Sequence, residues 1–229
     1  MLDELYDPVA NPYAPGAGTP PPALVGRDQT ITTADVSLRR LRAARASQHM
    51  LITGLRGVGK TVLLGKLASV AEHLGYRVIR VEALGGDDTI RSVLRQARRI
   101  VEEFDGGAKV GRALRSIESV SLTVAGTGIA IERQAPNADR EALTDVVTDL
   151  AEVAADEDLG VMIALDEAQT LDRHDLRRLL AGVHRCSQDG LPLYGLLAGL
   201  PNLVGEVVKA ATYAERMFTV ADLGPLTPD

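Results

Sequence analysis

Hydrophobic residues along the chain gather in short runs, and between the runs they recur every three or four positions. Runs without regular polar alternation are typical of strands covered on both faces, whereas a period of 3.6 predicts helices. The pattern predicts strands at 49–53, 77–81, 161–165, 193–198 and 217–220. It predicts helices at 29–46, 59–74, 88–104, 137–155, 173–188 and 202–213. Alternating strands and helices require right-handed crossovers, so we expect an α/β fold, a three-layer sandwich with a mainly parallel sheet.

The pattern changes its period over residues 117–132. There Val120, Leu122 and Val124 alternate with serine and threonine, and a Gly-Thr-Gly sequence follows at 126–128. Alternation with a period of two beside a glycine turn is typical of a β-hairpin. We therefore expect a β-hairpin insertion before the third predicted strand.

The first 23 residues differ in composition from the rest of the chain. Residues 1–23 hold six of the eleven prolines. Proline lacks a backbone N–H and disfavours helix at the residue before it, so this segment is predicted to be an extended arm. Residues 24–229 are predicted to form one folded domain, because a segment of this length can bury a sizeable core.

Composition excludes several classes of protein. The 229 residues carry 25 Lys+Arg and 31 Asp+Glu, a formal net charge of −6, which argues against a domain that coats nucleic acid or an anionic membrane. The single cysteine, Cys186, excludes an internal disulfide framework and a multi-cysteine metal cluster. The N-terminus has no leader pattern and no apolar run reaches ~18 residues, so we expect a cytoplasmic protein that does not bind membranes.

The strongest chemical signal is a glycine-rich loop. Residues 54–61 read Gly-Leu-Arg-Gly-Val-Gly-Lys-Thr, a full match to G-x-x-x-x-G-K-[ST]. In this pattern successive backbone N–H groups point at phosphate oxygens, Lys60 would bridge the β- and γ-phosphates, and Thr61 would give its hydroxyl to Mg²⁺. A chance glycine turn is the alternative, but a predicted strand precedes the loop and a predicted helix follows it. Nucleotide contacts are predicted at Gly54, Arg56, Gly57, Val58, Gly59, Lys60, Thr61 and Val62.

A second signal is the acidic pair at the end of the strand predicted at 161–165. Strand alternation would send Asp166 and Glu167 in opposite directions, so they are expected to have different roles. Asp166 would hold Mg²⁺ through its water shell, and Glu167 would orient and polarise the attacking water. A solvent-exposed acidic strand end is the alternative. The pair favours ATP hydrolysis, because a GTPase would need Asn-Lys-x-Asp, which is absent, and a small-molecule kinase would not need the second acid.

Four segments together resemble an AAA+ ATPase: Leu24-Val25-Gly26-Arg27, the glycine-rich loop, the Asp166-Glu167 pair and Glu215-Arg216-Met217-Phe218. The combination is most similar to bacterial relatives of the origin-recognition and transposition-helper ATPases. The opening Asn11-Pro12-Tyr13-x-Pro15-Gly16 is similar to that of a group of actinobacterial ATPases of this type. The resemblance extends over most of the chain.

The resemblance implies ATP or ADP and Mg²⁺ as ligands, and a homo-oligomer when a lid domain is present. It implies that backbone atoms of Leu24, Val25 and Gly26 line the adenine pocket; an ordinary loop packed on the core is the alternative. It also implies that Arg216 is an arginine finger that reaches the γ-phosphate of a neighbouring subunit. An ion pair with the preceding glutamate or with Asp222 is the alternative, and both interpretations of Arg216 stay open.

Two features depart from the family's pattern. The strand at 194–198 does not end in the polar residue that serves as the family's first sensor, and only Asn202 is available for that role. The family's helical lid, with its second sensor arginine, would begin where this sequence stops at Asp229. We therefore expect a core without a lid, which binds nucleotide, hydrolyses it poorly and stays largely monomeric.

These inferences lead to two functional hypotheses. The first is a Mg²⁺-dependent ATP-binding protein, an ATPase that couples nucleotide binding and hydrolysis to assembly or remodelling, with DNA or a protein as its client. The alternative is a nucleotide-controlled signalling switch with slow or no turnover.

Overall fold

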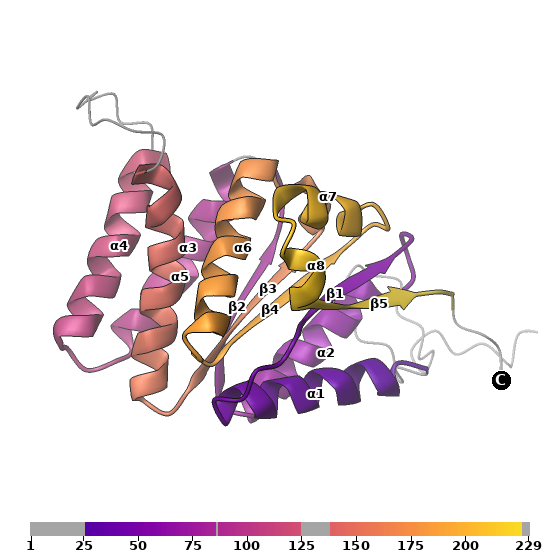
Figure 1. Cartoon of the computed structure of the whole chain (residues 1–229), viewed down its shortest axis with the longest axis horizontal. Helices are drawn as coiled ribbons and strands as arrows, with labels where there is room; N and C mark the ends of the chain where they lie inside the picture. The colour runs from indigo at the N-terminus through magenta and orange to yellow at the C-terminus, as the bar shows by residue number, and fades with distance from the viewer. Residues whose placement is uncertain (1–25, 86, 125–137, 226–229) are drawn as a thin grey trace, which may run out of the picture.

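Five parallel strands form the centre of the computed structural model, which describes residues 26–85, 87–124 and 138–225 (Figure 1). Their order across the sheet is β2-β3-β4-β1-β5. The chain places β1 in the interior and β2 at one edge, returns through β3 and β4, and adds β5 at the other edge. The strands are β1 (His49–Gly54), β2 (Tyr76–Glu82), β3 (Gly160–Asp166), β4 (Leu193–Gly199) and β5 (Phe218–Leu223).

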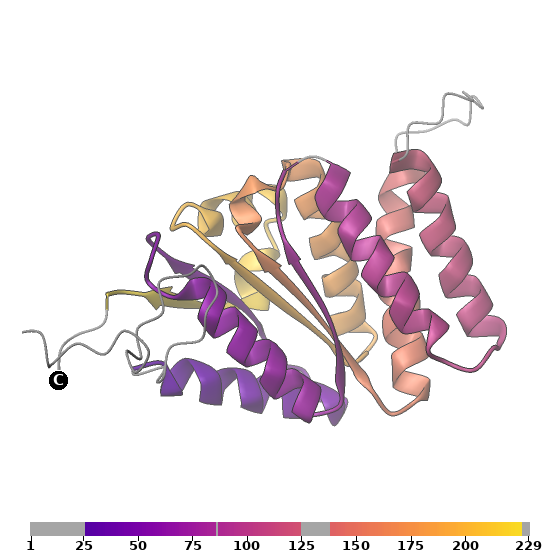
Figure 2. The same ribbon diagram turned by 180° about the vertical axis from the view of Figure 1, so that it is seen from behind.

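Helices cover both faces of the sheet, as the views from the two sides show (Figures 1 and 2). One face packs against α1 (Asp28–Arg42) and α2 (Lys60–His73). The other face packs against α5 (Ala138–Asp156), α6 (Arg173–Gln188), α7 (Leu203–Ala210) and α8 (Ala214–Met217). Helix α4 (Ala108–Val124) packs outside α5, and α3 (Asp87–Glu102) lies along the β2 edge. The predicted α/β three-layer fold with a parallel sheet is confirmed.

The hydrophobic core is split by the sheet into two layers, because successive side chains of a strand point to opposite faces. In β3, Met162 and Ala164 contribute to the layer under α1 and α2, whereas Val161 and Ile163 contribute to the layer under α5 and α6. All four side chains are at most 1% exposed. Burial on both faces explains why the interior strands read as unbroken hydrophobic runs.

The exposed edge of β2 is protected by a side chain of α3. The amide of Gln96 accepts a hydrogen bond from the backbone N–H of Arg80 (3.0 Å) and donates one to the Arg80 carbonyl (2.9 Å). A free strand edge invites pairing with other chains, and this contact occupies part of it. Among the described residues, no helix combines the length and the apolarity needed to cross a membrane.

The predicted β-hairpin insertion is wrong where the structure can test it. Residues 117–124 belong to α4, and the Gly-Thr-Gly sequence at 126–128 lies outside the described residues. Ala113, Ile117 and Val120 are all buried and recur at intervals of four and three residues, which is the period of a helix face. This face packs against neighbouring helices, so the helical period prevails over the local alternation of apolar residues with serine and threonine.

Candidate nucleotide-binding site

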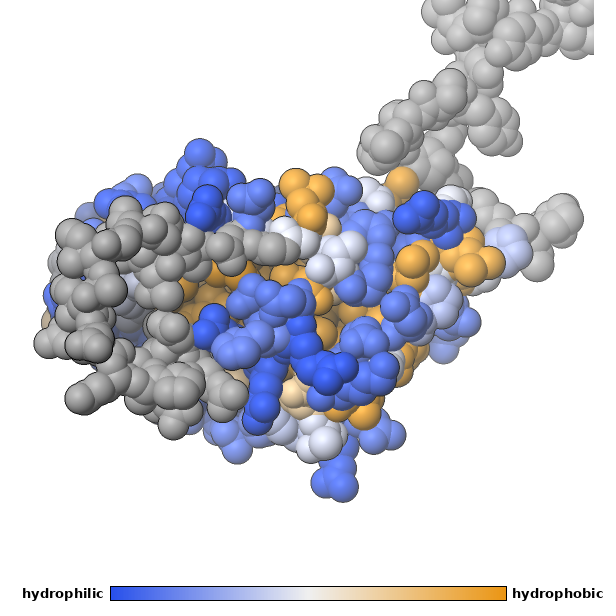
Figure 3. Space-filling view, turned by 90° about the horizontal axis from the view of Figure 1, so that it is seen from above, coloured by the Kyte–Doolittle hydropathy of each residue, from blue (hydrophilic) through white to orange (hydrophobic). Residues whose placement is uncertain are grey.

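The strands all run in the same direction, so their carboxyl ends meet at one edge of the sheet. The glycine-rich loop follows β1 there, and the acidic pair follows β3. Figure 3 looks down on this edge, where hydrophobic and hydrophilic side chains are mixed. In open α/β sheets, ligands bind outside the carboxyl ends of the strands, which is where both sequence motifs lie.

The loop between β1 and α2 is curled by glycines. Gly57 has φ +83° and Gly59 has φ +92°, which are backbone conformations that favour glycine. Gly59 is also the N-cap residue of α2 and gives no side-chain hydrogen bond to the first turn. The backbone N–H groups at the start of α2 are therefore left for an anion, as the motif requires.

Lys60 is folded into the loop. Its side chain is buried, and its Nζ donates hydrogen bonds to the carbonyl oxygens of Gly54 (3.0 Å) and Leu55 (2.8 Å). A buried ammonium group needs such acceptors, and these two bonds hold the charge inside the loop. An ammonium group has three donors, so one N–H remains for a phosphate oxygen.

A cavity of about 670 Å³ joins the loop to the ends of β2 and β3. Its volume lies in the range typical of ligand sites. Its lining residues are Arg56, Gly57, Gly59, Lys60, Thr61, Val62, Glu82, Ala83, Leu84, Glu167 and Thr170. The cavity thus brings Lys60 and Glu167, which are 107 positions apart in the sequence, to one site.

The side chains of Asp166 and Glu167 point to different places because the backbone turns after Asp166, and not because of strand alternation. Strand β3 ends at Asp166, and Glu167 has φ +49° and ψ 34°, a left-handed conformation that turns the chain into a short 3₁₀ helix at Ala168–Thr170. Asp166 is buried, and its Oδ1 accepts a hydrogen bond from the Glu167 N–H (2.9 Å). Left-handed backbone is uncommon for a residue other than glycine. The turn lets Glu167 reach the cavity while Asp166 stays inside.

Gln169 was missed by sequence reasoning, although it follows the acidic pair by two residues. Its Nε2 donates to Glu167 Oε2 (2.6 Å), and its Oε1 accepts from the N–H of Leu200 (3.1 Å). A Cβ added to Gly199 would overlap Gln169 Oε1, so this glycine makes room for the amide. Gln169 therefore connects Glu167 with the end of β4.

The expected sensor position is exposed. Asn202 is the N-cap residue of α7 and makes no side-chain capping hydrogen bond. At the end of β4, Gln169 accepts a hydrogen bond from the backbone N–H of Leu200 and donates one to Glu167, so it links these two residues. A sensor role for Asn202 stays a prediction.

The segment before α1 is described only from Gly26, which has φ +72°; Leu24 and Val25 lie outside the described residues. The next residue, Arg27, donates from Nη2 to the carbonyl oxygens of Gly224 (2.7 Å) and Val58 (3.4 Å). Arg27 thus ties the start of α1 to the glycine-rich loop and to the chain after β5. This contact places the segment that begins at Gly26 beside the loop.

Two further lining residues could not be found from motifs. Glu82 ends β2 directly beside Asp166 in the sheet register, and it adds a carboxylate to the cavity. Thr170 lies in the 3₁₀ helix and its hydroxyl donates to the carbonyl of Ala83 (2.7 Å). Their only sequence signal is that both follow predicted strands.

Arg216 lies far from the loop of its own chain. It is exposed in α8, just before β5 begins, whereas the loop lies at the end where β5 finishes, beside Leu223. In the part of the chain that the structure describes, no ion pair links Arg216 with Glu215 or Asp222. Asp222 Oδ1 instead accepts from the hydroxyl of Thr53 (3.1 Å).

A glycine-rich phosphate loop and an acidic strand end, joined by one cavity on a parallel sheet, define a P-loop nucleotide-binding fold. The chain belongs to the AAA ATPase domain family, whose model matches residues 23–197. Comparison with curated protein sequences gives no match.

Solved structures with the same fold include two that match most of this chain. Cdc6p from Pyrobaculum aerophilum is similar with a TM-score of 0.54 and 17% identity over 93% of this chain and 48% of that one. The ORC2 protein from Aeropyrum pernix, solved in its ADP form, has a TM-score of 0.55 and 22% identity over 91% of this chain and 50% of that one. At these identities the likeness shows the fold, and the chain spans about half the length of both.

Proposed function

We propose that this protein binds ATP with Mg²⁺ and hydrolyses it. The observation that carries the proposal is the cavity that brings Lys60 of the glycine-rich loop together with Glu167 after β3. Membership of the AAA ATPase domain family supports it, as does the ADP form of the similar ORC2 protein. We propose that residues 24–229 form the ATPase domain and that 24–26 lie against the adenine.

Each residue of the site has a separate task in this proposal. Lys60 binds the β- and γ-phosphates, and Thr61 and Asp166 hold Mg²⁺, which neutralises phosphate charge when bound. In the described part of the chain, no group of three or more His, Cys, Asp or Glu side chains could hold a metal by itself. Proteins usually hold Mg²⁺ through one or two side chains together with phosphates and water.

Glu167 orients the attacking water and accepts a proton from it. The hydrogen bond from Gln169 keeps the Glu167 carboxylate in one orientation, so catalysis would be mainly positional and electrostatic. The alternative function, a slow nucleotide switch, would use the same cavity with little or no turnover. Measured turnover decides between an ATPase and a switch.

We propose that turnover is coupled to assembly or remodelling of a DNA or protein client, in a homo-oligomer that forms when a lid domain is present. The position of Arg216 supports the oligomer, because this exposed arginine lies near the amino ends of the strands, too far to reach its own glycine-rich loop, and is open to contact from a neighbouring subunit.

Calorimetric titration with MgATP tests nucleotide binding. Replacing Lys60 by alanine should weaken binding roughly 100-fold, because the phosphates lose a charge-assisted donor in a partly dry loop. Lys66→Ala is the matched control, since Lys66 is exposed on the same helix, and it should bind like the wild type. Equal affinity of the wild type and Lys60→Ala would remove the loop from the proposed site.

A further inference from the structure

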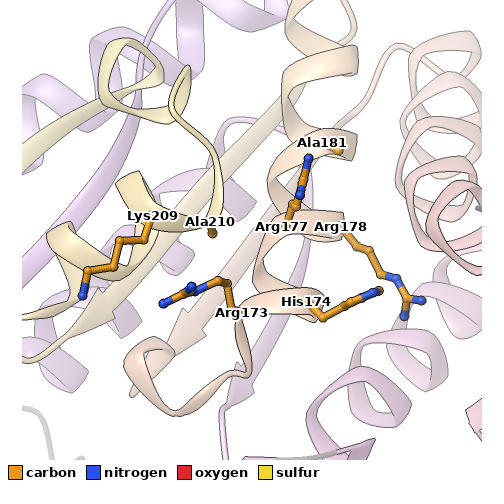
Figure 4. A pocket seen from close by; sticks show the side chains of 7 residues that line it. All are labelled: Arg173, His174, Arg177, Arg178, Ala181, Lys209 and Ala210. Carbon is orange, nitrogen blue, oxygen red and sulfur yellow. The ribbon is translucent and has the colours of Figure 1, made fainter. Parts of the chain in front are cut away.

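A second cavity, of about 290 Å³, lies between α6 and α7 and shares no residue with the nucleotide cavity. Four of its seven lining residues are permanent cations: Arg173, Arg177 and Arg178 from α6 and Lys209 from α7 (Figure 4). His174 and two alanines complete the lining. We call this cavity the basic groove.

Two of the four cations have acidic partners. Arg178 pairs with Asp175 (3.4 Å), and Lys209 pairs with Glu206 (2.9 Å). Arg173 and Arg177 are exposed, one helical turn apart, and neither forms an ion pair within the described residues. The charge of Arg173 still reaches Glu206, whose pKa is lowered by Lys209 and, to a smaller extent, by Arg173. The groove therefore keeps a positive charge on a chain whose net charge is −6.

The positively charged side of α6 continues into an aromatic pair. His184 lies seven residues after Arg177, which is close to two helical turns, so the two share a face of α6. The ring of His184 stacks on that of Tyr213 with centroids 4.4 Å apart and planes inclined by 22°. The groove thus presents guanidinium groups, which bind phosphate in a bidentate manner, and the His184–Tyr213 stack lies outside its lining.

We propose that the basic groove binds the phosphate backbone of nucleic acid, independently of sequence. The general surface of an acidic chain repels such a polymer, so contact must be local, and this groove concentrates the charge that it needs. Nucleic acid would then be the client of the proposed ATPase. Binding at the groove does not depend on ATPase function, and only the coupling between the two sites rests on it.

The structure contains a path for that coupling. Gln169, which donates a hydrogen bond to Glu167, lies four residues before the start of α6. It also accepts a hydrogen bond from the N–H of Leu200, and Leu200 lies three residues before the start of α7. The α6 wall of the basic groove therefore begins beside the Gln169 contacts, whereas α7 lines the groove through its last two residues, Lys209 and Ala210. A change at Glu167 on hydrolysis would reach the groove through the start of α6, at Arg173.

Fluorescence anisotropy with a dye-labelled duplex DNA of mixed sequence tests the proposal on the full chain. The double variant Arg173→Glu/Arg177→Glu should bind the duplex at least roughly tenfold more weakly. For this variant, the slope of log affinity against log salt concentration should be smaller in magnitude by about two. Each phosphate contact contributes about 0.9 to that slope, and the variant loses two contacts.

Arg95→Glu/Arg99→Glu is the matched control, since these arginines have the same spacing and are exposed on α3, away from the groove. It should keep the wild-type affinity and slope. Equal losses in the two double variants, or no duplex binding by the wild type, would overturn the proposal. Binding of polyglutamate in place of DNA, lost only in the groove variant, would also overturn it and would assign the groove to an acidic protein.

The same samples separate this proposal from the proposed function. The groove variant should bind MgATP in calorimetry like the wild type, because neither arginine lines the nucleotide cavity. If the wild type binds no MgATP while duplex binding follows the expected pattern, the ATPase proposal fails and the basic groove stands. If MgATP binds and the groove variant retains full duplex affinity, the groove fails and the ATPase proposal stands.

Discussion

At the scale of single residues, Glu167 carries the chemistry of the proposed site. Its side chain lines the cavity opposite the glycine-rich loop, and its left-handed backbone places it there. Replacing Glu167 by glutamine keeps the size of the side chain and removes its ability to take a proton. We expect MgATP to bind normally and turnover to fall ~100-fold or more. Phosphate release at saturating MgATP measures this, and wild-type turnover in the variant would make Glu167 structural.

Gln169 is expected to be a positioning residue, because it touches Glu167 and Leu200 and does not line the cavity. Gln169→Ala should lower kcat by roughly tenfold with little change in KM, since only the orientation of Glu167 is lost. In a Glu167→Gln background the same substitution should have almost no further effect, because residues of one network are not additive. Equal effects in both backgrounds would contradict the proposed link.

At the scale of elements, β1 begins with a buried histidine that joins it to β4 and α6. His49 Nδ1 accepts a hydrogen bond from the Gly195 N–H (3.2 Å), and Nε2 lies 2.9 Å from the Ser187 hydroxyl. Burial, and secondarily the nearby His184, lowers the pKa of His49 from 6.5 to about 4. The folded state therefore holds His49 neutral at a pH where the unfolded chain protonates it.

This arrangement predicts how the stability of the fold depends on pH. Between pH 6.5 and 4 the unfolded state binds the extra proton, so the free energy of unfolding falls as pH falls, by about 3 kcal/mol from this group. Above pH 6.5 His49 is neutral in both the folded and the unfolded state, so its contribution to the free energy of unfolding is fully present. Urea unfolding at a series of pH values should show a steeper acid loss for the wild type than for His49→Asn, which retains an acceptor for Gly195. If the free energy of unfolding falls equally with pH in the two proteins, the pH dependence cannot be assigned to His49.

At the scale of the whole molecule, Arg216 and the glycine-rich loop lie at opposite ends of β5. The strand has 6 residues, which at ~3.3 Å each separates them by about 20 Å. If Arg216 acts in a neighbouring subunit, Arg216→Ala should lower turnover ~10³-fold or more while MgATP still binds.

Mixing two inactive variants tests the same arrangement. Lys60→Ala keeps the arginine and loses the nucleotide site, whereas Arg216→Ala keeps the site and loses the arginine. A mixture should regain turnover, because one subunit supplies what its neighbour lacks, and the gain should rise with protein concentration. Brisk, concentration-independent turnover of Arg216→Ala would show that each site is complete within its own chain.

Local features of the sequence determined a large part of this protein. The glycine-rich loop needs particular residues at fixed spacing, so Lys60 and its loop could be placed without a structure. Strand β3 could be predicted because burial on both faces requires a continuous hydrophobic run. Asp166 and Glu167 follow that run directly, so their place at the carboxyl edge of a parallel sheet followed from the pattern as well.

Tertiary structure decided what neighbouring residues alone leave ambiguous. The segment 117–124 alternates like a strand, yet packing of its helical face against other helices makes it part of α4. The strand order β2-β3-β4 brings Glu82 beside Asp166, and the turn after β3 sets Gln169 between Glu167 and Leu200. The basic groove likewise joins α6 and α7 across an intervening strand. Such contacts depend on the three-dimensional arrangement of distant segments, because periodicity and spacing describe only residues that are close along the chain.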